Sequence, residues 1–176
     1  DIEAFIEAKD KGGLSNFNLS IGVTDAFMQA VQQGAQFDLV HKAIPDLRAH
    51  PQATQRADGM WVYRTVPAKA LWDKVMRSTY AIAEPGILFL DRMNQENNLW
   101  YCETIEATNP CAEEPLPPYG CCDLASPNLC MFVRDPFTPH AWFDFDAFAS
   151  VCRVGVRFLD NVLDVTYWPL PEQRAE

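Results

Sequence analysis

Basic residues are scarce in this sequence, which has 14 Lys and Arg against 24 Asp and Glu and a formal net charge of −10. Proteins that bind long nucleic acid strands cluster Lys and Arg, which release counterions from the phosphates. The charge therefore argues against long-strand nucleic acid as a partner. The sequence also lacks any run of about eighteen apolar residues, the length that spans a bilayer. Residues 1–3 do not start a secretion signal, so we expect a cytoplasmic protein without a membrane span.

Zinc-knuckle spacing is also missing, although the sequence contains six cysteines. Zinc ligands of that kind are separated by about two to four residues, and the adjacent Cys121 and Cys122 cannot easily bind one ion together. A disulfide framework would need a small secreted chain, which neither the length nor the targeting signals support. We expect no metal site, and thiol chemistry in a reducing compartment instead. The cysteines are Cys102, Cys111, Cys121, Cys122, Cys130 and Cys152.

Apolar patterns along the 176 residues predict strands that alternate with helices. The expected elements are a helix over 2–9, a strand over 17–23, a helix from Thr24 to Gly34, a surface excursion over 43–59, a strand over 60–66, a helix opened by Pro67 and ended before Gly86, a buried strand over 87–90, a strand within 124–133 and a helix over 145–162. Such alternation is typical of α/β architecture with largely parallel strands. One globular unit is the expectation for this length.

Two helices have stripes that we expect to be buried. The helix after Pro67 has Leu71, Trp72, Val75, Met76 and Tyr80 on one stripe, which predicts a core face. In the last helix, Cys152 falls on the apolar face and is expected to behave as a small core hydrophobe.

The segment Asn109–Glu113 places an amide, a thiol and a carboxylate at alternate positions, with the sequence Asn-Pro-Cys-Ala-Glu. In extended backbone, alternate side chains share a face, so the three groups could meet one small molecule. Pro110 lacks a backbone donor and fixes its own φ, and three more prolines follow by residue 118. We therefore expect Cys111 on a rigid loop rather than in a sheet ladder.

The stretch from Gly86 to Leu129 has several further features around this segment, namely Asn94, Asn97, Asn98, Ala107-Thr108-Asn109-Pro110-Cys111 and Cys121-Cys122. With them it resembles the active-site region of the large chain of ribonucleotide reductases, in the adenosylcobalamin-dependent branch. The similarity runs along nearly the whole chain, from residues 16–18 to 158–161. It implies part of a ten-stranded α/β barrel, in which a finger loop carries the radical cysteine to the centre. Residues 1–176 would then be a single segment of this catalytic domain, incomplete at both ends.

The resemblance also implies a role for each reacting residue. Cys111 matches the cysteine whose thiyl radical takes the 3′-hydrogen of a ribonucleotide. Glu113 matches the base that removes the 3′-hydroxyl proton while water leaves from C2′. Asn109 matches the amide that hydrogen-bonds the ribose hydroxyls. Cys122 matches one member of the cysteine pair that becomes oxidised, and its partner would lie before Asp1.

The family's cofactor and partners follow from the same resemblance. It implies adenosylcobalamin as the radical source, nucleotide effectors, a thioredoxin- or glutaredoxin-type reductant, and a homodimer when the chain is complete. The loop Gly12-Gly13-Leu14-Ser15-Asn16 corresponds to one that links the allosteric specificity site to the substrate base. A turn that simply ends the first helix predicts the same residues. The sequence departs from the family pattern at Ala112 and Glu114, where glycine and glutamine are commoner, and at Ala125 and Pro127.

Two alternatives stay open. The same reaction could start from a radical made in a separate metal subunit. A non-catalytic α/β domain or a zinc-stabilised binding domain is the other possibility, and the cysteines are its only support. We expect the 176-residue piece to be inactive alone, because the partner thiol and the family's phosphate-binding loop would lie outside it.

Overall fold

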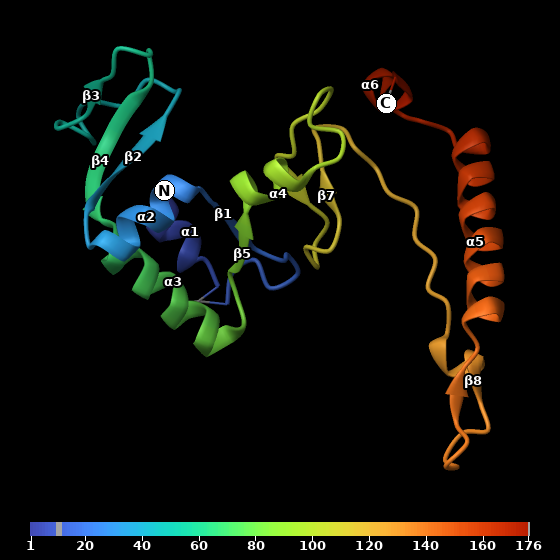
Figure 1. Cartoon of the computed structure of the whole chain (residues 1–176). Helices are drawn as coiled ribbons and strands as arrows, with labels where there is room; N and C mark the ends of the chain where they lie inside the picture. The colour runs from blue at the N-terminus through green and yellow to red at the C-terminus, as the bar shows by residue number, and fades with distance from the viewer. Residues whose placement is uncertain (10–11, 176) are drawn as a thin grey trace. The chain divides into compact units, whose positions relative to one another are not determined.

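The computed structural model describes residues 1–9 and 12–175 of the chain. It divides into two compact units, which we call unit 1 (Asp1–Pro118) and unit 2 (Tyr119–Glu176) (Figure 1). Within the described residues, no helix combines the length and apolarity needed to cross a membrane.

The described residues of unit 1 form four helices and three small sheets. Its elements are α1 (Ile2–Ile6), β1 (Ser20–Val23), α2 (Asp25–Gln33), β2 (Gln36–His41), β3 (Thr54–Gln55), β4 (Trp61–Pro67), α3 (Ala68–Ile82), β5 (Gly86–Phe89), α4 (Leu90–Glu96), β6 (Ala107–Thr108) and β7 (Pro115–Leu116). Strands β1 and β5 pair in parallel, as the alternation of strands and helices predicts. The order β2-β4-β3 forms an antiparallel sheet, and β6 pairs with β7 as a hairpin.

Local sequence signals set the ends of α2. The Thr24 hydroxyl accepts a hydrogen bond from the Phe27 N–H at 3.2 Å, and Gly34 follows the last turn with φ of 63°. A side-chain oxygen at the first position and a left-handed glycine after the last are the usual helix boundaries. The predicted helix from Thr24 to Gly34 is confirmed.

The core of unit 1 lies between α2, α3 and the first strands. Phe27 meets Phe37 edge to face, with ring centroids 5.1 Å apart. The other buried members are Ile6, Ile21, Val23, Ala30, Val66, Ala68, Leu71 and Val75. The predicted α3 stripe is confirmed for Leu71 and Val75 but wrong for Tyr80, whose side chain is 95% exposed.

Strand β2 is absent from the sequence prediction. The pairing of β2 with β4 shifts register between Leu39 and Val40. The extra residue, Tyr63, lies in β4, so the shift leaves β2 itself uninterrupted. The alternation of polar and apolar residues in β2 covers only Gln36–Leu39 and ends where Val40 follows Leu39. The segment 43–59, predicted as a surface excursion, is the connection between these two strands and also contains β3.

Unit 2 consists of a short hairpin and one long helix. Its elements are η1, a 3-10 helix (Leu129–Phe132), β8 (Val133–Arg134), β9 (Trp142–Phe143), α5 (Phe145–Val165) and α6 (Pro171–Ala175). The strand predicted within 124–133 is wrong for most of its length. There the Asn128 side chain accepts a hydrogen bond from the Cys130 N–H at 3.1 Å, which favours a local turn over a strand.

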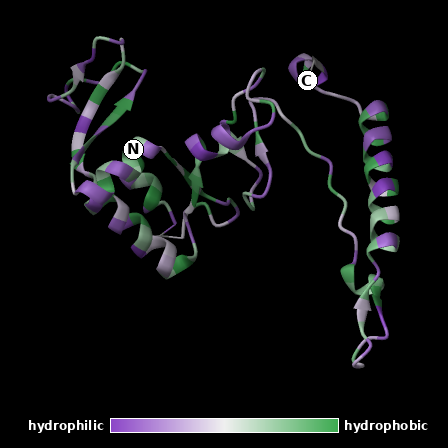
Figure 2. Cartoon of the chain, viewed as in Figure 1, coloured by the Kyte–Doolittle hydropathy of each residue, from purple (hydrophilic) through white to green (hydrophobic). Residues whose placement is uncertain are grey.

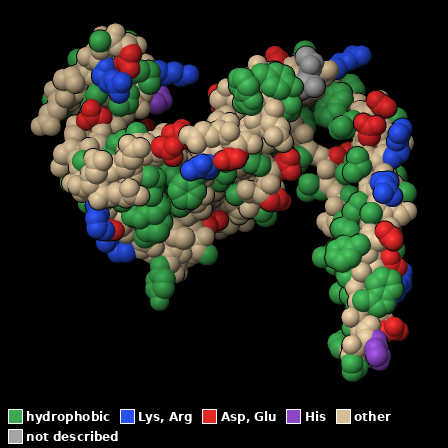
Figure 3. Space-filling model, viewed as in Figure 1, with side chains coloured by type: hydrophobic (Ala, Val, Ile, Leu, Met, Phe, Trp, Pro, Cys, Tyr) green, Lys and Arg blue, Asp and Glu red, His purple; other side chains and the backbone are tan. Residues whose placement is uncertain are grey.

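The predicted helix over 145–162 is confirmed as α5. Asp144 caps it, because one carboxylate oxygen accepts from the Ala147 N–H at 2.9 Å. Hydrophobic residues follow one side of this helix (Figure 2), and many of their side chains are exposed (Figure 3). No residue of α5 is buried within the described structure, so Cys152, predicted to be a core residue, is only half-buried.

The strands of the described residues form four small sheets and no closed barrel. The α/β class predicted from sequence is nevertheless present, with parallel pairing between β1 and β5. The ten-stranded α/β barrel implied by the resemblance stays a prediction.

Candidate active site

The segment Asn109–Glu114 is the turn of the β6–β7 hairpin. Its backbone closes through the Ala112 N–H, which donates to the Asn109 carbonyl at 3.0 Å, and through the Asn109 N–H, which donates to the Glu114 carbonyl at 3.2 Å. Glu106 and Leu116 continue the ladder at the base of the hairpin, with an N–H to carbonyl distance of 3.2 Å. The turn is therefore tied at both ends, as expected for a positioning loop.

Cys111 lies in this turn and is exposed, as is Glu113, whereas Asn109 is half-buried. The prediction that Cys111 sits on a loop rather than in a ladder is confirmed. The extended backbone assumed for residues 109–113 is wrong, because the chain turns there. Alternation by itself therefore does not put the three side chains on one face.

The two ends of the Asn109 side-chain amide, its oxygen and its NH₂ group, are used differently. Its Oδ1 accepts a hydrogen bond from the Glu114 N–H at 3.0 Å, which closes the turn from inside. Its NH₂ group makes no hydrogen bond within the described residues, so two donors are left for a ligand. The role of Asn109 toward hydroxyl groups stays a prediction.

Ala112 has a φ of 66°, in the left-handed region that favours glycine. This is the position at which the resembled family commonly has glycine. The departure noted in the sequence therefore falls where the backbone makes a side chain costly.

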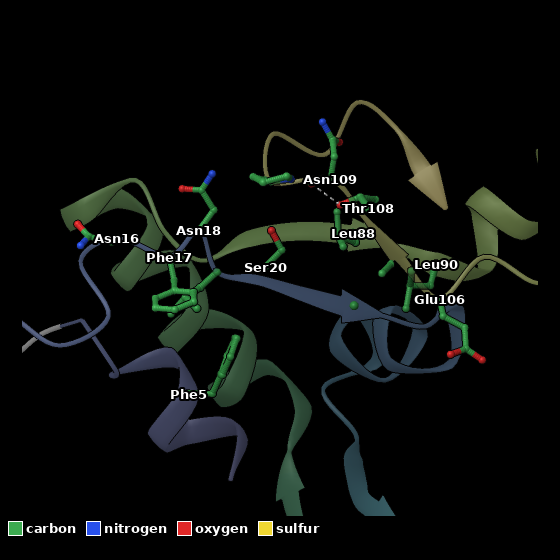
Figure 4. Close-up of a pocket in the computed structure, with 14 residues that line it drawn as sticks. Phe5, Asn16, Phe17, Asn18, Ser20, Leu88, Leu90, Glu106, Thr108 and Asn109 are labelled. Carbon is green, nitrogen blue, oxygen red and sulfur yellow. Dashed lines mark hydrogen bonds between the residues drawn. The ribbon is translucent and has the colours of Figure 1, made fainter. Parts of the chain in front are cut away.

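A cavity of about 630 Å³ lies beside the hairpin and includes Asn109 and Pro110 in its wall. Phe5, Phe17, Leu88 and Leu90 supply apolar surface, and Asn16, Asn18, Ser20, Glu106 and Thr108 supply polar groups. Figure 4 shows Ser20 projecting from the start of β1 toward the side on which the hairpin lies. The wall is thus mixed polar and apolar, with hydrogen-bonding groups available to a polar small molecule.

The structure brings together some of the predicted site residues. Asn16, from the predicted allosteric loop, and Asn109 line the same cavity. Gly12, Gly13, Leu14 and Ser15 are exposed and are not part of its wall, and Gly12 and Leu14 have positive φ values of 75° and 52°. Cys122 is an exposed residue of unit 2. The allosteric role of the loop and the redox role of Cys122 stay predictions.

Sequence reasoning missed Ser20 as a cavity residue. The predicted strand over 17–23 gives Ser20 no role of its own. The sequence offers no signal for it, because the pairing of Ser20 with Gly86, where an added Cβ would lie 2.9 Å from the Ser20 Oγ, is visible only in the structure. A glycine opposite a serine in a parallel pair indicates room kept for the hydroxyl group.

Two carboxyl groups, neither of them in the hairpin, have displaced pKa values. A hydrogen bond from Arg64 lowers the pKa of Glu3. A hydrogen bond from the Ala147 N–H, together with Arg134, lowers the pKa of Asp144 in unit 2. Among the described residues, no group of three or more His, Cys, Asp or Glu is placed to hold a metal ion.

Comparison with known proteins gives one family model, described as ribonucleotide reductase, barrel domain, which matches residues 1–176. A vitamin B12-dependent ribonucleoside-diphosphate reductase of Mycobacterium tuberculosis is 38% identical over 174 residues, covering 98% of this chain and 22% of the relative. One of the same name from Thermoplasma acidophilum is 34% identical over 174 residues, 98% of this chain and 20% of the relative. A ribonucleoside-diphosphate reductase large chain from Encephalitozoon cuniculi is 34% identical over 113 residues, 62% of this chain and 14% of the relative. The chain thus spans about a fifth of the length of the first two.

Proposed function

Since this chain belongs to the ribonucleotide reductase family, in its barrel domain, we propose that the protein containing it reduces ribonucleotides to 2′-deoxyribonucleotides for DNA synthesis. The observation that carries the proposal is the closed hairpin turn, which presents an exposed Cys111 between Asn109 and Glu113. We take this hairpin to be the finger loop of a ten-stranded α/β barrel. Residues 1–176 would be one segment of that barrel, completed by chain outside it.

Each group of the turn has a defined part in this reaction. The Cys111 sulfur, as a thiyl radical, takes the 3′-hydrogen of the ribose. Glu113 accepts the 3′-hydroxyl proton, and the 2′-hydroxyl leaves as water with a proton from a thiol pair, whose second hydrogen goes to C2′. Asn109 donates hydrogen bonds to the ribose hydroxyls through its free NH₂ group. Holding the reacting groups in a closed turn supplies the positioning on which such a reaction depends.

The two electrons for the reduction come from a thiol pair that becomes a disulfide. Cys122 is the member of that pair within this chain, and its partner lies outside residues 1–176. A thioredoxin- or glutaredoxin-type dithiol then reduces the disulfide by thiol exchange. Exposure of Cys122 suits a thiol that must meet a second sulfur.

Adenosylcobalamin would supply the radical that starts the reaction. Its fit to this chain rests on the exposed thiol of Cys111, which stands at the tip of a turn where a radical donor can reach it. The relatives from M. tuberculosis and T. acidophilum are named vitamin B12-dependent, which favours this source over a separate metal subunit. Nucleotide effectors, a homodimer and a cytoplasmic location complete the proposal.

The test uses the full-length protein with ribonucleoside di- and triphosphates, a reduced dithiol, and adenosylcobalamin added or omitted. Cys111→Ser is expected to abolish 2′-deoxynucleotide formation, because an alcohol cannot replace the thiol as a radical carrier. Cys102→Ser is the matched control, since Cys102 is also an exposed thiol of unit 1 but lies outside the turn. Appreciable turnover by Cys111→Ser would overturn the assignment. Wild-type turnover only with a metal subunit would favour the alternative radical source.

A further inference from the structure

Asn94, on α4, makes an unusual contact with the chain that leads into the hairpin. Its Oδ1 accepts from the Ile105 N–H at 2.8 Å, and its Nδ2 donates to the Ile105 carbonyl at 2.9 Å. One side-chain amide thus pairs with both backbone groups of one residue, much as a neighbouring strand would. Nδ2 also donates to the Leu90 carbonyl at 3.0 Å, which fixes the orientation of the amide.

Ile105 needs this partner because it is buried, with an exposed fraction of 7%. Among the described residues, Asn94 is the only partner of its N–H and its carbonyl. A buried backbone N–H or carbonyl without a partner destabilises the folded protein by about as much as the loss of a hydrogen bond. Ile105 precedes the first strand of the hairpin, β6, by two positions, so this contact fixes the base from which the Cys111 turn extends.

The helix that carries Asn94 is itself fixed to the rest of unit 1. The Asp91 carboxylate accepts from the Asp25 N–H at 2.8 Å, and the Gln95 side chain donates to the Asp25 carboxylate at 3.2 Å. Leu90 packs so closely over Gly22 that an added Cβ would lie 2.4 Å from its Cδ1. Asn94 therefore connects the hairpin to the β1–α2 body, and Figure 1 shows α4 beside the hairpin strands.

We propose that Asn94 is a positioning residue, which holds the base of the β6–β7 hairpin so that the Cys111 thiol keeps its place in the active site. The mechanical part of this proposal stands on the hydrogen bonds alone. Its consequence for catalysis rests on the proposed function. Asn94 is not part of the cavity wall, so its loss should disturb placement of the thiol rather than binding of the substrate.

Asn97 provides a matched control. It is also a half-buried asparagine that makes side-chain hydrogen bonds, to the Glu103 carboxylate at 2.8 Å and from the Leu99 N–H at 3.0 Å. Both partners lie in the connection between α4 and the hairpin, so Asn97 does not hold the hairpin strands. Asn94→Ala and Asn97→Ala remove the same chemical group from neighbouring positions.

The experiment compares these variants of the full-length protein by amide hydrogen exchange and by steady-state kinetics. For Asn94→Ala we expect exchange to rise about tenfold at Ile105 and in residues 107–114, since both hydrogen bonds to the Ile105 backbone are lost there. We expect kcat to fall by about tenfold or more with KM within about threefold, because orientation contributes to the chemical step. Asn97→Ala should leave both measurements near those of the wild type.

A second variant keeps the test informative if Asn94→Ala folds poorly. Asn94→Asp keeps an oxygen that accepts from the Ile105 N–H, but it replaces the NH₂ donor with an oxygen that faces the Leu90 and Ile105 carbonyls. Exchange at Ile105 should therefore rise less than in Asn94→Ala, and kcat should still fall. Unchanged exchange over 107–114, or an unchanged kcat, in a folded variant would refute the role of Asn94. A wild-type protein that does not reduce ribonucleotides would refute the proposed function, whereas the exchange rates would still decide on the hairpin.

Discussion

Replacing Ala112 with glycine tests whether the Cys111 turn stores backbone strain. Ala112 has a φ of 66°, where a residue with a Cβ pays about 1–2 kcal/mol. Glycine avoids this cost but gives up about 0.4–1 kcal/mol because the unfolded chain gains freedom. The difference predicts that Ala112→Gly stabilises the closed turn by about 0.5–1 kcal/mol.

Amide hydrogen exchange in the full-length protein measures this change where it occurs. The Ala112 and Glu114 N–H groups both donate to Asn109, to its backbone carbonyl at 3.0 Å and to its Oδ1 at 3.0 Å. Opening the turn breaks both hydrogen bonds, so these amides report on it directly. A gain of 0.5–1 kcal/mol corresponds to exchange that is about two- to fivefold slower at both positions.

Ala83 supplies the matched control, because it is an alanine with a φ of 61° far along the chain from the turn. It follows the last residue of α3, and its N–H donates to the Thr79 carbonyl at 2.8 Å. Ala83→Gly should slow exchange at that helix end and leave the hairpin unchanged. Faster or unchanged exchange at Ala112 and Glu114 in Ala112→Gly, together with slower exchange in Ala83→Gly, would refute strain in the turn.

Two further predictions concern other parts of the chain. In unit 2, hydrogen bonds from the Ala147 N–H and from Arg134 hold the pKa of Asp144 below its usual range. The stabilisation they give is present at neutral pH and is lost as the pH falls through that lowered pKa. Exchange of the Ala147 amide, corrected for its intrinsic rate, should therefore rise in acid for the wild type but much less for Asp144→Asn, and equal pH profiles would contradict this. In unit 1, Gly22→Ala should displace Leu90 and cost about 1–3 kcal/mol, seen as a lower thermal midpoint and a raised KM. An unchanged midpoint and KM would show that Leu90 has room to move.

The sequence predicted those elements whose signals are local. Thr24 and Gly34 define α2 through contacts within a few residues, and both ends are confirmed. Strand β2 was not predicted because its alternation of polar and apolar residues covers only Gln36–Leu39. The strand predicted within 124–133 failed because the Asn128 side chain favours a local turn instead.

The candidate site shows the same division between local and long-range information. Pro110 and the prolines after it were enough to predict a loop at Cys111. The tie between Asn94 and Ile105 could not be predicted, since it joins residues eleven positions apart across an irregular connection. A hydrogen bond of this kind has no periodic signature in the sequence.

The chemistry of the turn also explains why asparagine suits position 109. Its carbonyl oxygen is occupied by the Glu114 N–H, so the side chain both closes the turn and presents an NH₂ donor. Aspartate could accept the same hydrogen bond but would have no donor left, and would place a second negative charge near Glu113. Glutamine carries the same amide on a longer stem, which must be fixed at a greater entropic cost to make one contact. The side chain that orders the backbone around Cys111 is therefore the one that can also orient a hydroxyl-bearing ligand beside it.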